Sequence, residues 1–144
     1  MNQTIERIKI EKISYDRIIA CRNVEKADIL YNNFFKETHV FMYDYCLIRK
    51  KGYLILDFGK EICGRIHIIF NYGENTSKVR VRLGESVFET CAEKNENNAG
   101  NCHSLRDYCF DSVSWGDVST SESGFRFVRI DLIAGNEVKL SSVY

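Results

Sequence analysis

The sequence lacks the features that would tie it to a membrane or to export. No apolar run in the 144 residues approaches the roughly 18 that a helix needs to cross a bilayer. The first seven residues, Met-Asn-Gln-Thr-Ile-Glu-Arg, already carry charge, and the apolar stretch of a signal peptide does not follow them. We therefore expect a cytoplasmic protein that has no membrane partner.

The chain also lacks net charge. Lys and Arg together number 20, and so do Asp and Glu. Without an excess of positive charge there is no general attraction to nucleic acid, so we expect no nucleic-acid partner. The charges are unevenly spread, because residues 1–82 hold 15 basic and 10 acidic side chains and residues 83–144 hold 5 and 10. This asymmetry predicts ion pairs between the two halves of the sequence.

No two cysteines form a C-x-x-C pair, and their spacings fit no zinc ribbon or zinc finger. The six cysteines are Cys21, Cys46, Cys63, Cys91, Cys102 and Cys109. We predict neither a metal site nor a cofactor. In a reducing compartment the thiols should stay reduced, and we expect several of them to be buried as small apolar side chains.

Few residues could carry catalysis. The only histidines are His39, His67 and His103, and the sequence contains no H-E-x-x-H, G-x-S-x-G, P-loop or G-x-G-x-x-G motif. Glu85 and Asp107 could form a paired-carboxylate site, but ion pairing with nearby arginines explains them more simply. We assign no catalytic residue, and a small enzyme using these two carboxylates remains the least favoured alternative.

From about Tyr53 onward, apolar residues recur with a period of two, which is typical of strands. Along residues 64–70 and 78–83 they alternate with polar or basic residues, so one face should lie on a core and the other toward water or a partner domain. Residues 125–133 are apolar on both faces and predict a central strand. Further strands are predicted at residues 53–58, 105–113 and 137–144.

Turn-forming residues separate these strands. Residues 71–77 predict a hairpin connection between the strands at 64–70 and 78–83. Residues 84–104 are polar and acidic and predict a long surface loop. Residues 116–124 predict a second polar connection.

The first 52 residues are less regular. Ile8, Ile10 and Ile13 suggest an opening strand, and residues 24–35 fit either a short helix or a strand pair. A series of short strands with little helical period and no βαβ alternation predicts one all-β domain over residues 1–144. We expect an antiparallel two-sheet β-sandwich that resembles a jelly roll.

Four segments resemble, in the same order, the motifs of the amino-terminal β-sandwich region of bacterial α-L-rhamnosidases and related glycoside hydrolases. They are residues 56–66, 79–86, 103–107 and 124–130. One departure is Asn101-Cys102-His103, where the family tends to carry Asn-Asp-His. The resemblance implies a galactose-binding-like sandwich that carries no catalytic residue, because in such enzymes the catalytic acids lie on a separate (α/α)₆ barrel. The implied partner is that catalytic domain or its remnant.

The same motifs carry candidate structural residues. Their glycines, Gly59, Gly64, Gly84 and Gly124, suit bulges, tight turns or close backbone approach at strand ends. Arg80, Arg82, Arg126 and Arg129 are expected to pair with Glu85, Asp107 and Asp131 across neighbouring strands, and Arg106 belongs to the third motif. The basic face of residues 78–82 would then be a docking surface for the catalytic domain.

A sugar-binding sandwich needs an aromatic ring to stack on the sugar and polar side chains to reach its hydroxyls. Trp115 and Tyr108 are the aromatic candidates, and Asn101, His103 and Asp107 are the polar ones. The alternative explanation of Trp115 is a cover over the edge of the core. Two functions stay open: an accessory domain that supports a catalytic domain, or an autonomous carbohydrate-binding module for a rhamnose-containing or other glycan. Some such modules hold a structural calcium ion, for which the sequence indicates no ligands.

Overall fold

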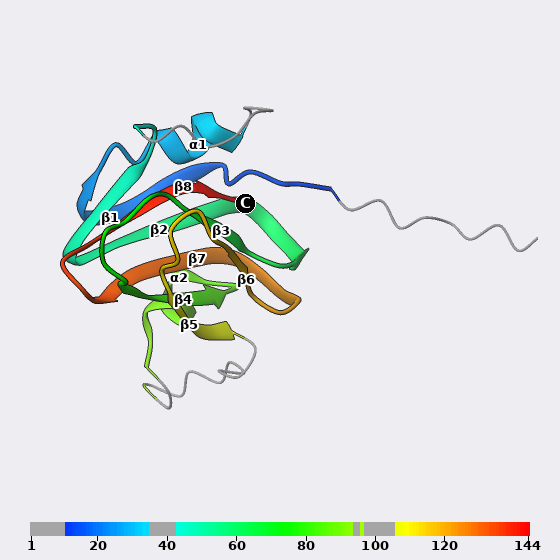
Figure 1. Ribbon diagram of the computed structural model, residues 1–144. Coiled ribbons are helices and arrows are strands. Elements are labelled where there is room, and N and C mark those ends of the chain that lie inside the picture. The colour runs from blue at the N-terminus through cyan, green and yellow to red at the C-terminus, as the bar shows by residue number, and fades with distance from the viewer. Residues whose placement is uncertain (1–10, 35–42, 94–95, 97–105) are drawn as a thin grey trace, which may run out of the picture.

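The computed structural model describes residues 11–34, 43–93, 96 and 106–144, and in them it contains eight strands and two short helices (Figure 1). In chain order these are β1 (Arg17–Glu25), α1 (Ile29–Phe34), β2 (Cys46–Gly64), β3 (His67–Phe70), β4 (Lys78–Gly84), α2 (Val87–Cys91), β5 (Asp107–Asp111), β6 (Asp117–Ser119), β7 (Ser123–Ala134) and β8 (Glu137–Val143). Every strand pair is antiparallel. The predicted all-β fold with little helix is confirmed.

The sheet folds over at a bend in its longest strand. Its order is β5-β4-β7-β2-β8-β3-β6, and β1 pairs with β2 outside this path. The first part of β2 pairs with β8 and the later part with β7. Between these parts Lys51 has a φ of 60°, and a Cβ atom on Gly52 would lie only 2.5 Å from the carbonyl oxygen of Arg49. The backbone at residues 50–52 therefore turns β2 from one half of the sheet into the other.

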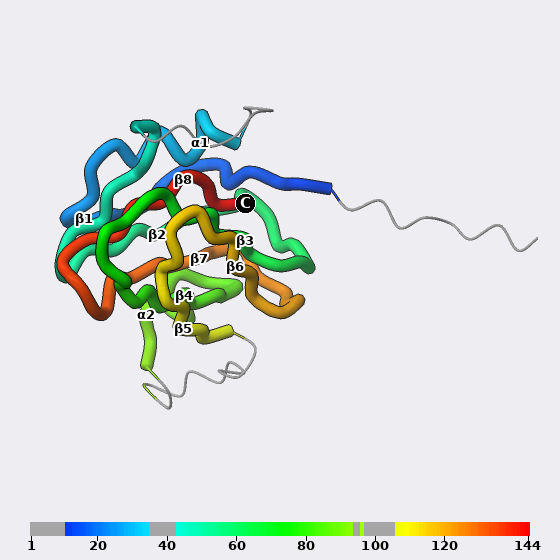
Figure 2. The backbone as a smooth tube through the Cα atoms, in the orientation of Figure 1, coloured from blue at the N-terminus to red at the C-terminus, as the bar shows by residue number. Residues whose placement is uncertain are grey.

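The two halves enclose one hydrophobic core. Alternate side chains of β4, such as Val79 and Val81, and of β3, such as Ile68 and Phe70, are fully buried and belong to the same cluster. Each fully buried side chain of this size contributes about 1.5–3 kcal/mol of hydrophobic stabilisation. Figure 2 shows β1 and β8 in one layer and β7, β4 and β5 in the other, which is the expected sandwich arrangement. Strand β7 pairs with both β2 and β4, as its central position predicted.

Three connections cross between the halves at one end of the sandwich. They are residues 71–77 from β3 to β4, 112–116 from β5 to β6, and 135–136 from β7 to β8. The end of the first connection lies beside the starts of the other two, because Lys78 pairs with both Asp111 and Ala134. The bend of β2 lies at the same end, since the backbone N–H of Lys50 donates to the carbonyl oxygen of Asn136 at 2.8 Å.

The predicted hairpin across residues 71–77 is wrong. Strand β3 pairs with β6 and β8, whereas β4 pairs with β5 and β7. The apolar faces of β3 and β4 meet across the core from opposite halves, so the connection must pass from one half to the other instead of folding back beside its own strand. This crossing supplies one wall of the cavity described below.

Short elements appear where connections were expected. Helix α2 lies inside the predicted loop of residues 84–104 and begins at Ser86, whose Oγ accepts a hydrogen bond from the backbone N–H of Glu89 at 3.2 Å. Strand β6 lies inside the predicted connection of residues 116–124. Of the expected opening strand, Ile8 and Ile10 lie outside the described residues and Ile13 precedes β1. For residues 24–35 the structure selects the helix, α1.

The predicted ion pairs between the two halves of the sequence are confirmed on β4. Arg80 donates to Asp107 at 2.7 and 2.9 Å, and Arg82 donates to Asp131 at 3.1 Å. Arg82 is buried, and its guanidinium also contacts Glu93 beyond α2. The expectation that residues 78–82 present a basic docking surface is therefore wrong, because neighbouring acids and α2 cover the two arginines.

Arg126 has a partner that differs from the expected ones. Arg126 pairs with Asp57, with 2.9 Å between its Nε and the carboxylate Oδ1. The antiparallel pairing of β2 with β7 puts Asp57 opposite Phe127, the neighbour of Arg126. Glu85 pairs with Arg106 at 2.9 Å, in agreement with the explanation of this carboxylate by a nearby arginine.

Candidate functional site

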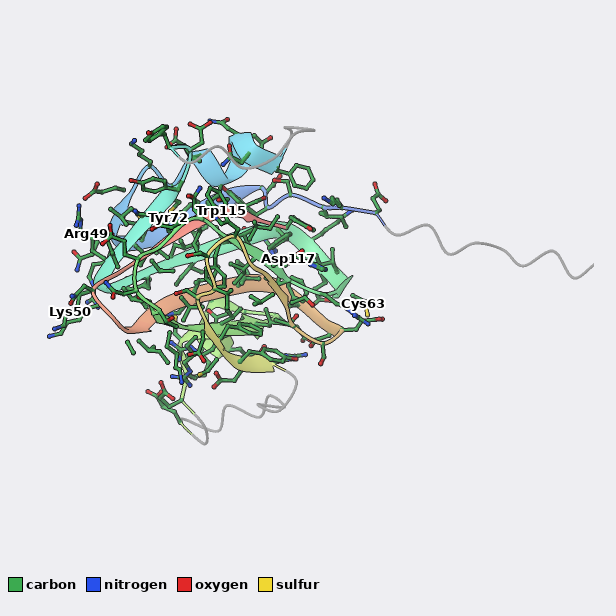
Figure 3. The ribbon with its side chains drawn as sticks, in the orientation of Figure 1. Arg49, Lys50, Cys63, Tyr72, Trp115 and Asp117 are labelled. Carbon is green, nitrogen blue, oxygen red and sulfur yellow. The ribbon has the colours of Figure 1, made fainter. Side chains whose placement is uncertain are left out.

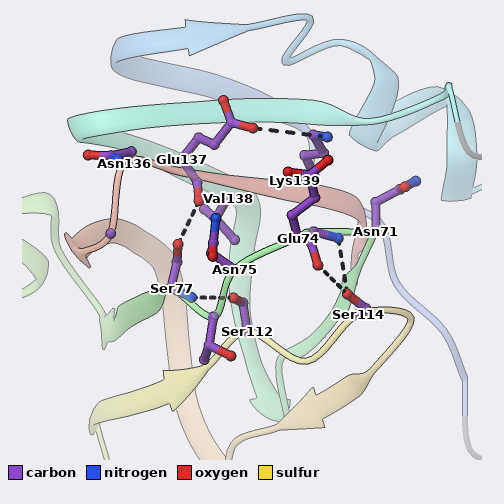
Figure 4. A pocket seen from close by; sticks show the side chains of 13 residues that line it. Asn71, Glu74, Asn75, Ser77, Ser112, Ser114, Asn136, Glu137, Val138 and Lys139 are labelled. Atoms are coloured by element: carbon purple, nitrogen blue, oxygen red, sulfur yellow. Dashed lines mark hydrogen bonds and ion pairs between the residues drawn. The ribbon is translucent and has the colours of Figure 1, made fainter.

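A cavity of about 470 Å³ opens at the end of the sandwich where the connections cross (Figure 4). Its walls are Asn71, residues 73–77, Ser112, Ser114, the turn at 135–136 and the first part of β8. The lining is mostly amide, hydroxyl and backbone groups, with the charged side chains of Glu74, Glu137 and Lys139 among them. The volume falls in the range of about 300–1,000 Å³ that is typical of small-molecule sites.

The walls are tied to one another by hydrogen bonds. The backbone N–H of Ser77 donates to Ser112 Oγ at 2.8 Å, and Ser77 Oγ donates to the carbonyl oxygen of Glu137 at 2.6 Å. Ser114 Oγ accepts from the N–H of Gly73 at 3.0 Å and donates to its carbonyl oxygen at 2.8 Å. These contacts join two of the connections to each other and to the start of β8. A ligand would therefore meet walls that are already ordered and would lose little affinity to ordering them.

Two further positions fix the backbone of the cavity. Asn71 is buried, and its Nδ2 donates to Ser141 Oγ at 2.9 Å. Gly135 has a φ of 97°, and a Cβ atom there would run into the side chain of Ser77. The turn from β7 to β8 therefore requires glycine in order to approach the opposite wall this closely.

Two exposed aromatic rings belong to residues that are chain neighbours of the cavity lining, although neither residue lines the cavity itself. Trp115 and Tyr72 are 46% and 43% exposed, and their ring centroids lie 6.5 Å apart at an interplanar angle of 36° (Figure 3). Each directly follows a lining residue, Ser114 or Asn71. Trp115 has a φ of 61°, a strained value that is held by hydrogen bonds of the neighbouring Gly116. Trp115 is also outside the core cluster, so the structure gives no support to the explanation that it covers the core.

The structure separates the other predicted sugar contacts from Trp115. Tyr108 stacks on Phe110 with centroids 6.0 Å apart and packs against the core, and Asp107 is held by Arg80. Both residues lie at the start of β5. This strand is roughly 13 Å long, and its far end leads into the connection that carries Trp115. Asn101 and His103 lie outside the described residues.

Sequence reasoning missed Tyr72 and the polar residues of the β3–β4 connection. The Asn-Tyr-Gly-Glu-Asn-Thr-Ser segment was interpreted as a hairpin turn, and no local pattern links it to Trp115, which lies 43 positions later. The signal that the sequence offered was a tyrosine between two turn-forming residues, Asn71 and Gly73.

The structural motif glycines divide into two groups. Gly59 has a φ of 78°, and at Gly84 a Cβ atom would lie 2.9 Å from the carbonyl oxygen of Ser86. At Gly64 and Gly124 a Cβ atom would meet nothing within 4 Å. Arg129 donates to Asp131 at 2.8 Å and lies over the ring of Tyr53, so it holds β7 against its neighbours.

The carboxylates considered for catalysis are engaged in ion pairs. Glu85 pairs with Arg106, and Asp107 pairs with Arg80. Within the described ranges, no group of three or more His, Cys, Asp or Glu side chains is arranged to hold a metal ion. None of the helices in the described part of the chain is long and apolar enough to cross a membrane.

The cysteines that the structure describes are free thiols: Cys21, Cys46, Cys63, Cys91 and Cys109. Of these five only Cys46 is buried, where burial raises the pKa of its thiol to about 12. The expectation that several cysteines are buried is wrong for this part of the chain, because Cys21, Cys63 and Cys109 occupy outward positions of their strands.

Neither a protein-family model nor a curated protein sequence matches the chain significantly. Solved structures do match it. The CBM32 module of AlyQ, in complex with 4,5-unsaturated mannuronic acid, has a TM-score of 0.53 and 15% identity over 90% of this chain and 95% of that one. The C-terminal domain of a chitobiase from Bacteroides fragilis has a TM-score of 0.56 and 11% identity over 88% and 89%.

A larger enzyme also contains a similar domain. A rhamnosidase from Klebsiella oxytoca with rhamnose bound has a TM-score of 0.50 and 16% identity, and the match covers 72% of this chain but 23% of that one. At these identities the comparisons show the fold alone. It is the galactose-binding-like β-sandwich of CBM32-type modules, which is the predicted fold class.

Proposed function

We propose that the chain is a carbohydrate-binding module and that its ligand site is the cavity together with Trp115 and Tyr72. The observation that carries the proposal is the exposed ring pair beside a polar cavity with ordered walls. An aromatic face packs against the C–H groups of a sugar ring, and amide and hydroxyl groups bind its hydroxyls. The amides of Asn75 and Asn136 are exposed at this cavity and are suited to that role.

The similar structures support this choice over a purely structural role. The AlyQ module was solved with an unsaturated mannuronic acid, so a sandwich of this shape serves sugar binding in at least one protein. The cavity of the present chain has polar walls and flanking aromatic rings, which such binding requires. A domain that served only as a support would need neither.

The proposal is tested by Trp115→Ala in calorimetric titrations against a broad saccharide panel. We expect at least one saccharide to bind the unaltered protein and to bind the variant about 30-fold more weakly, because the stacked ring contributes about 2 kcal/mol. Phe88→Ala is the matched control, since Phe88 is exposed on α2, away from the cavity lining. Equal affinity of both variants, or no binding across the panel, would contradict the proposal.

The accessory-domain hypothesis becomes the second candidate. It is favoured by the rhamnosidase match, in which the similar region is less than a quarter of the enzyme, and by the four motif segments. We propose in this case that the module holds a glycoside hydrolase at its substrate. The coding frame downstream of residue 144 tests it, and a following barrel-coding frame is the expected result.

A further inference from the structure

A group of cations lies at the bend of β2. Arg49, Lys50 and Lys51 are consecutive and exposed, and Arg22 of β1 reaches them by donating to the carbonyl oxygen of Lys51 at 2.9 and 3.2 Å. We call these four residues the basic ridge. Figure 3 shows Arg49 and Lys50 projecting at the end of the sheet.

The basic ridge contacts residues that line the cavity. The backbone N–H of Lys50 donates to the carbonyl oxygen of Asn136, and Asn136 lines the cavity. The guanidinium of Arg49 lies 3.7 Å from the carboxylate of Glu137, another lining residue. A ligand that extends from the cavity past the β7–β8 turn would therefore meet these cations.

The ridge carries uncompensated positive charge, although the whole chain is neutral. Glu25 pairs with Arg49 at 2.7 Å, and Glu137 is shared between Arg49 and Lys139. Among the described residues, no ion pair involves Arg22, Lys50 or Lys51. The cavity lining also contains the acidic side chain of Glu74. Glu74 lies on the β3–β4 connection toward Ser114, whereas Asn136, which the ridge contacts, lies at the opposite side of the cavity (Figure 4).

We propose that the site takes an acidic glycan, whose carboxylate or sulfate groups lie against the basic ridge while a neighbouring sugar ring occupies the cavity. This inference rests on the proposed function and adds the chemical class of the ligand. Exposed cations each contribute little, but several of them at one rim discriminate by charge and increase the rate of encounter with an anionic partner. The cavity supplies the contacts to hydroxyl groups that distinguish a glycan from other anions.

The test compares oligouronates with their carboxyl-reduced counterparts, which have the same skeleton without the charge. At low salt we expect the acidic form to bind about tenfold more tightly, and the difference should shrink as added salt screens the ridge. The double substitution Lys50→Gln and Lys51→Gln should abolish most of this difference and leave binding of the neutral form unchanged. Lys60→Gln with Arg65→Gln removes two exposed charges elsewhere and should preserve it. The second arm of the experiment compares the binding of sulfated oligosaccharides with that of their desulfated forms.

The outcomes separate this inference from the proposed function. If neutral saccharides bind as tightly as acidic ones and Trp115→Ala weakens both, the acidic-glycan inference is overturned and the binding module stands. If the preference for acid persists without Lys50 and Lys51, the ridge is not its source and the inference is overturned. If no saccharide of either kind binds, both proposals fail. Tighter binding of a single-stranded oligonucleotide than of any acidic saccharide would also overturn the inference.

Discussion

Replacing Asp57 by Asn is expected to lower the free energy of unfolding by about 2–4 kcal/mol. The side chain of Asp57 is 1% exposed in the middle of β2. Its carboxylate accepts hydrogen bonds from Arg126 at 2.9 and 3.2 Å, from Arg17 at 3.0 and 3.1 Å, and from the backbone N–H of Gly59 at 2.8 Å. The residue therefore joins β1, β2 and β7 at one point.

The size of the effect follows from the exposure of the partners. Removing one member of a fully buried ion pair costs about 3–5 kcal/mol, because the other charge is left without water. Arg17 and Arg126 are 66% and 36% exposed and can be hydrated after the substitution, which shifts the expected cost toward the lower end of that range and below it. Urea denaturation at neutral pH measures it. Arg17→Gln, which removes only an exposed partner, is the control and should cost less than about 1 kcal/mol.

The same group predicts a dependence on pH. The hydrogen bonds from Arg126 act against the desolvation of Asp57 and hold the pKa of its carboxyl well below the usual value. Because the pKa is lower in the folded state, the stabilisation is present above the unfolded value of about 3.9 and is lost as the pH falls below it. Asp57→Asn should therefore flatten the loss of stability between about pH 5 and pH 2. A variant as stable as the unaltered protein, with the same acid sensitivity, would show that this cluster does not hold the strands together.

Arg82→Ala is expected to lower the free energy of unfolding by about 2–3 kcal/mol. The Arg82 side chain is 7% exposed, and its guanidinium donates to Asp131 at 3.1 Å and to the carbonyl oxygen of Cys91 at 3.2 Å. Asp131 keeps Arg129 as a partner after the substitution, so the cost stays below that of isolating a buried charge. The loss of packing by the arginine stem adds to it.

Lys78→Ala supplies the matched control on the same strand. Lys78 is exposed, and its Nζ lies 3.6 Å from Asp111, so its removal should change the free energy of unfolding by less than about 0.5 kcal/mol. Equal effects of the two substitutions in urea denaturation would mean that Arg82 faces solvent as freely as Lys78. Such a result would support the hypothesis that the basic face of β4 is a docking surface.

Local patterning predicted the strands but not their partners. Val79, Val81 and Leu83 alternate with charged residues because β4 has one face on the core, and this information lies within the strand itself. Which strands pair depends on how the two halves close over a shared core, and residues 71–77 carry no sign of that closure. Strand β6 and helix α2 were missed because three and five residues are too short to display a period.

The site was predicted only in part for the same reason. Trp115 stood out as the single tryptophan in a turn. The ring of Tyr72 lies 6.5 Å from that of Trp115, and Asn136 lines the cavity. These two residues come from two other connections, and only the crossing of the connections between the halves brings them near Trp115. Tyr108 and Asp107 were grouped with Trp115 because an aromatic ring and a polar side chain suit a sugar, but the extended strand β5 separates them from the connection that carries Trp115.

The most direct test of the binding site is a titration of the ¹⁵N-labelled protein with the tightest saccharide, followed by backbone amide NMR shifts. A module that binds through the cavity should show its largest shifts at residues 71–77, 112–116 and 135–139. The amides of α2 and of residues 17–21, the part of β1 before the basic ridge, should change little. Shifts that cluster on α2 or on residues 17–21, or the absence of shifts at saturating saccharide, would contradict the assignment of the cavity as the carbohydrate site.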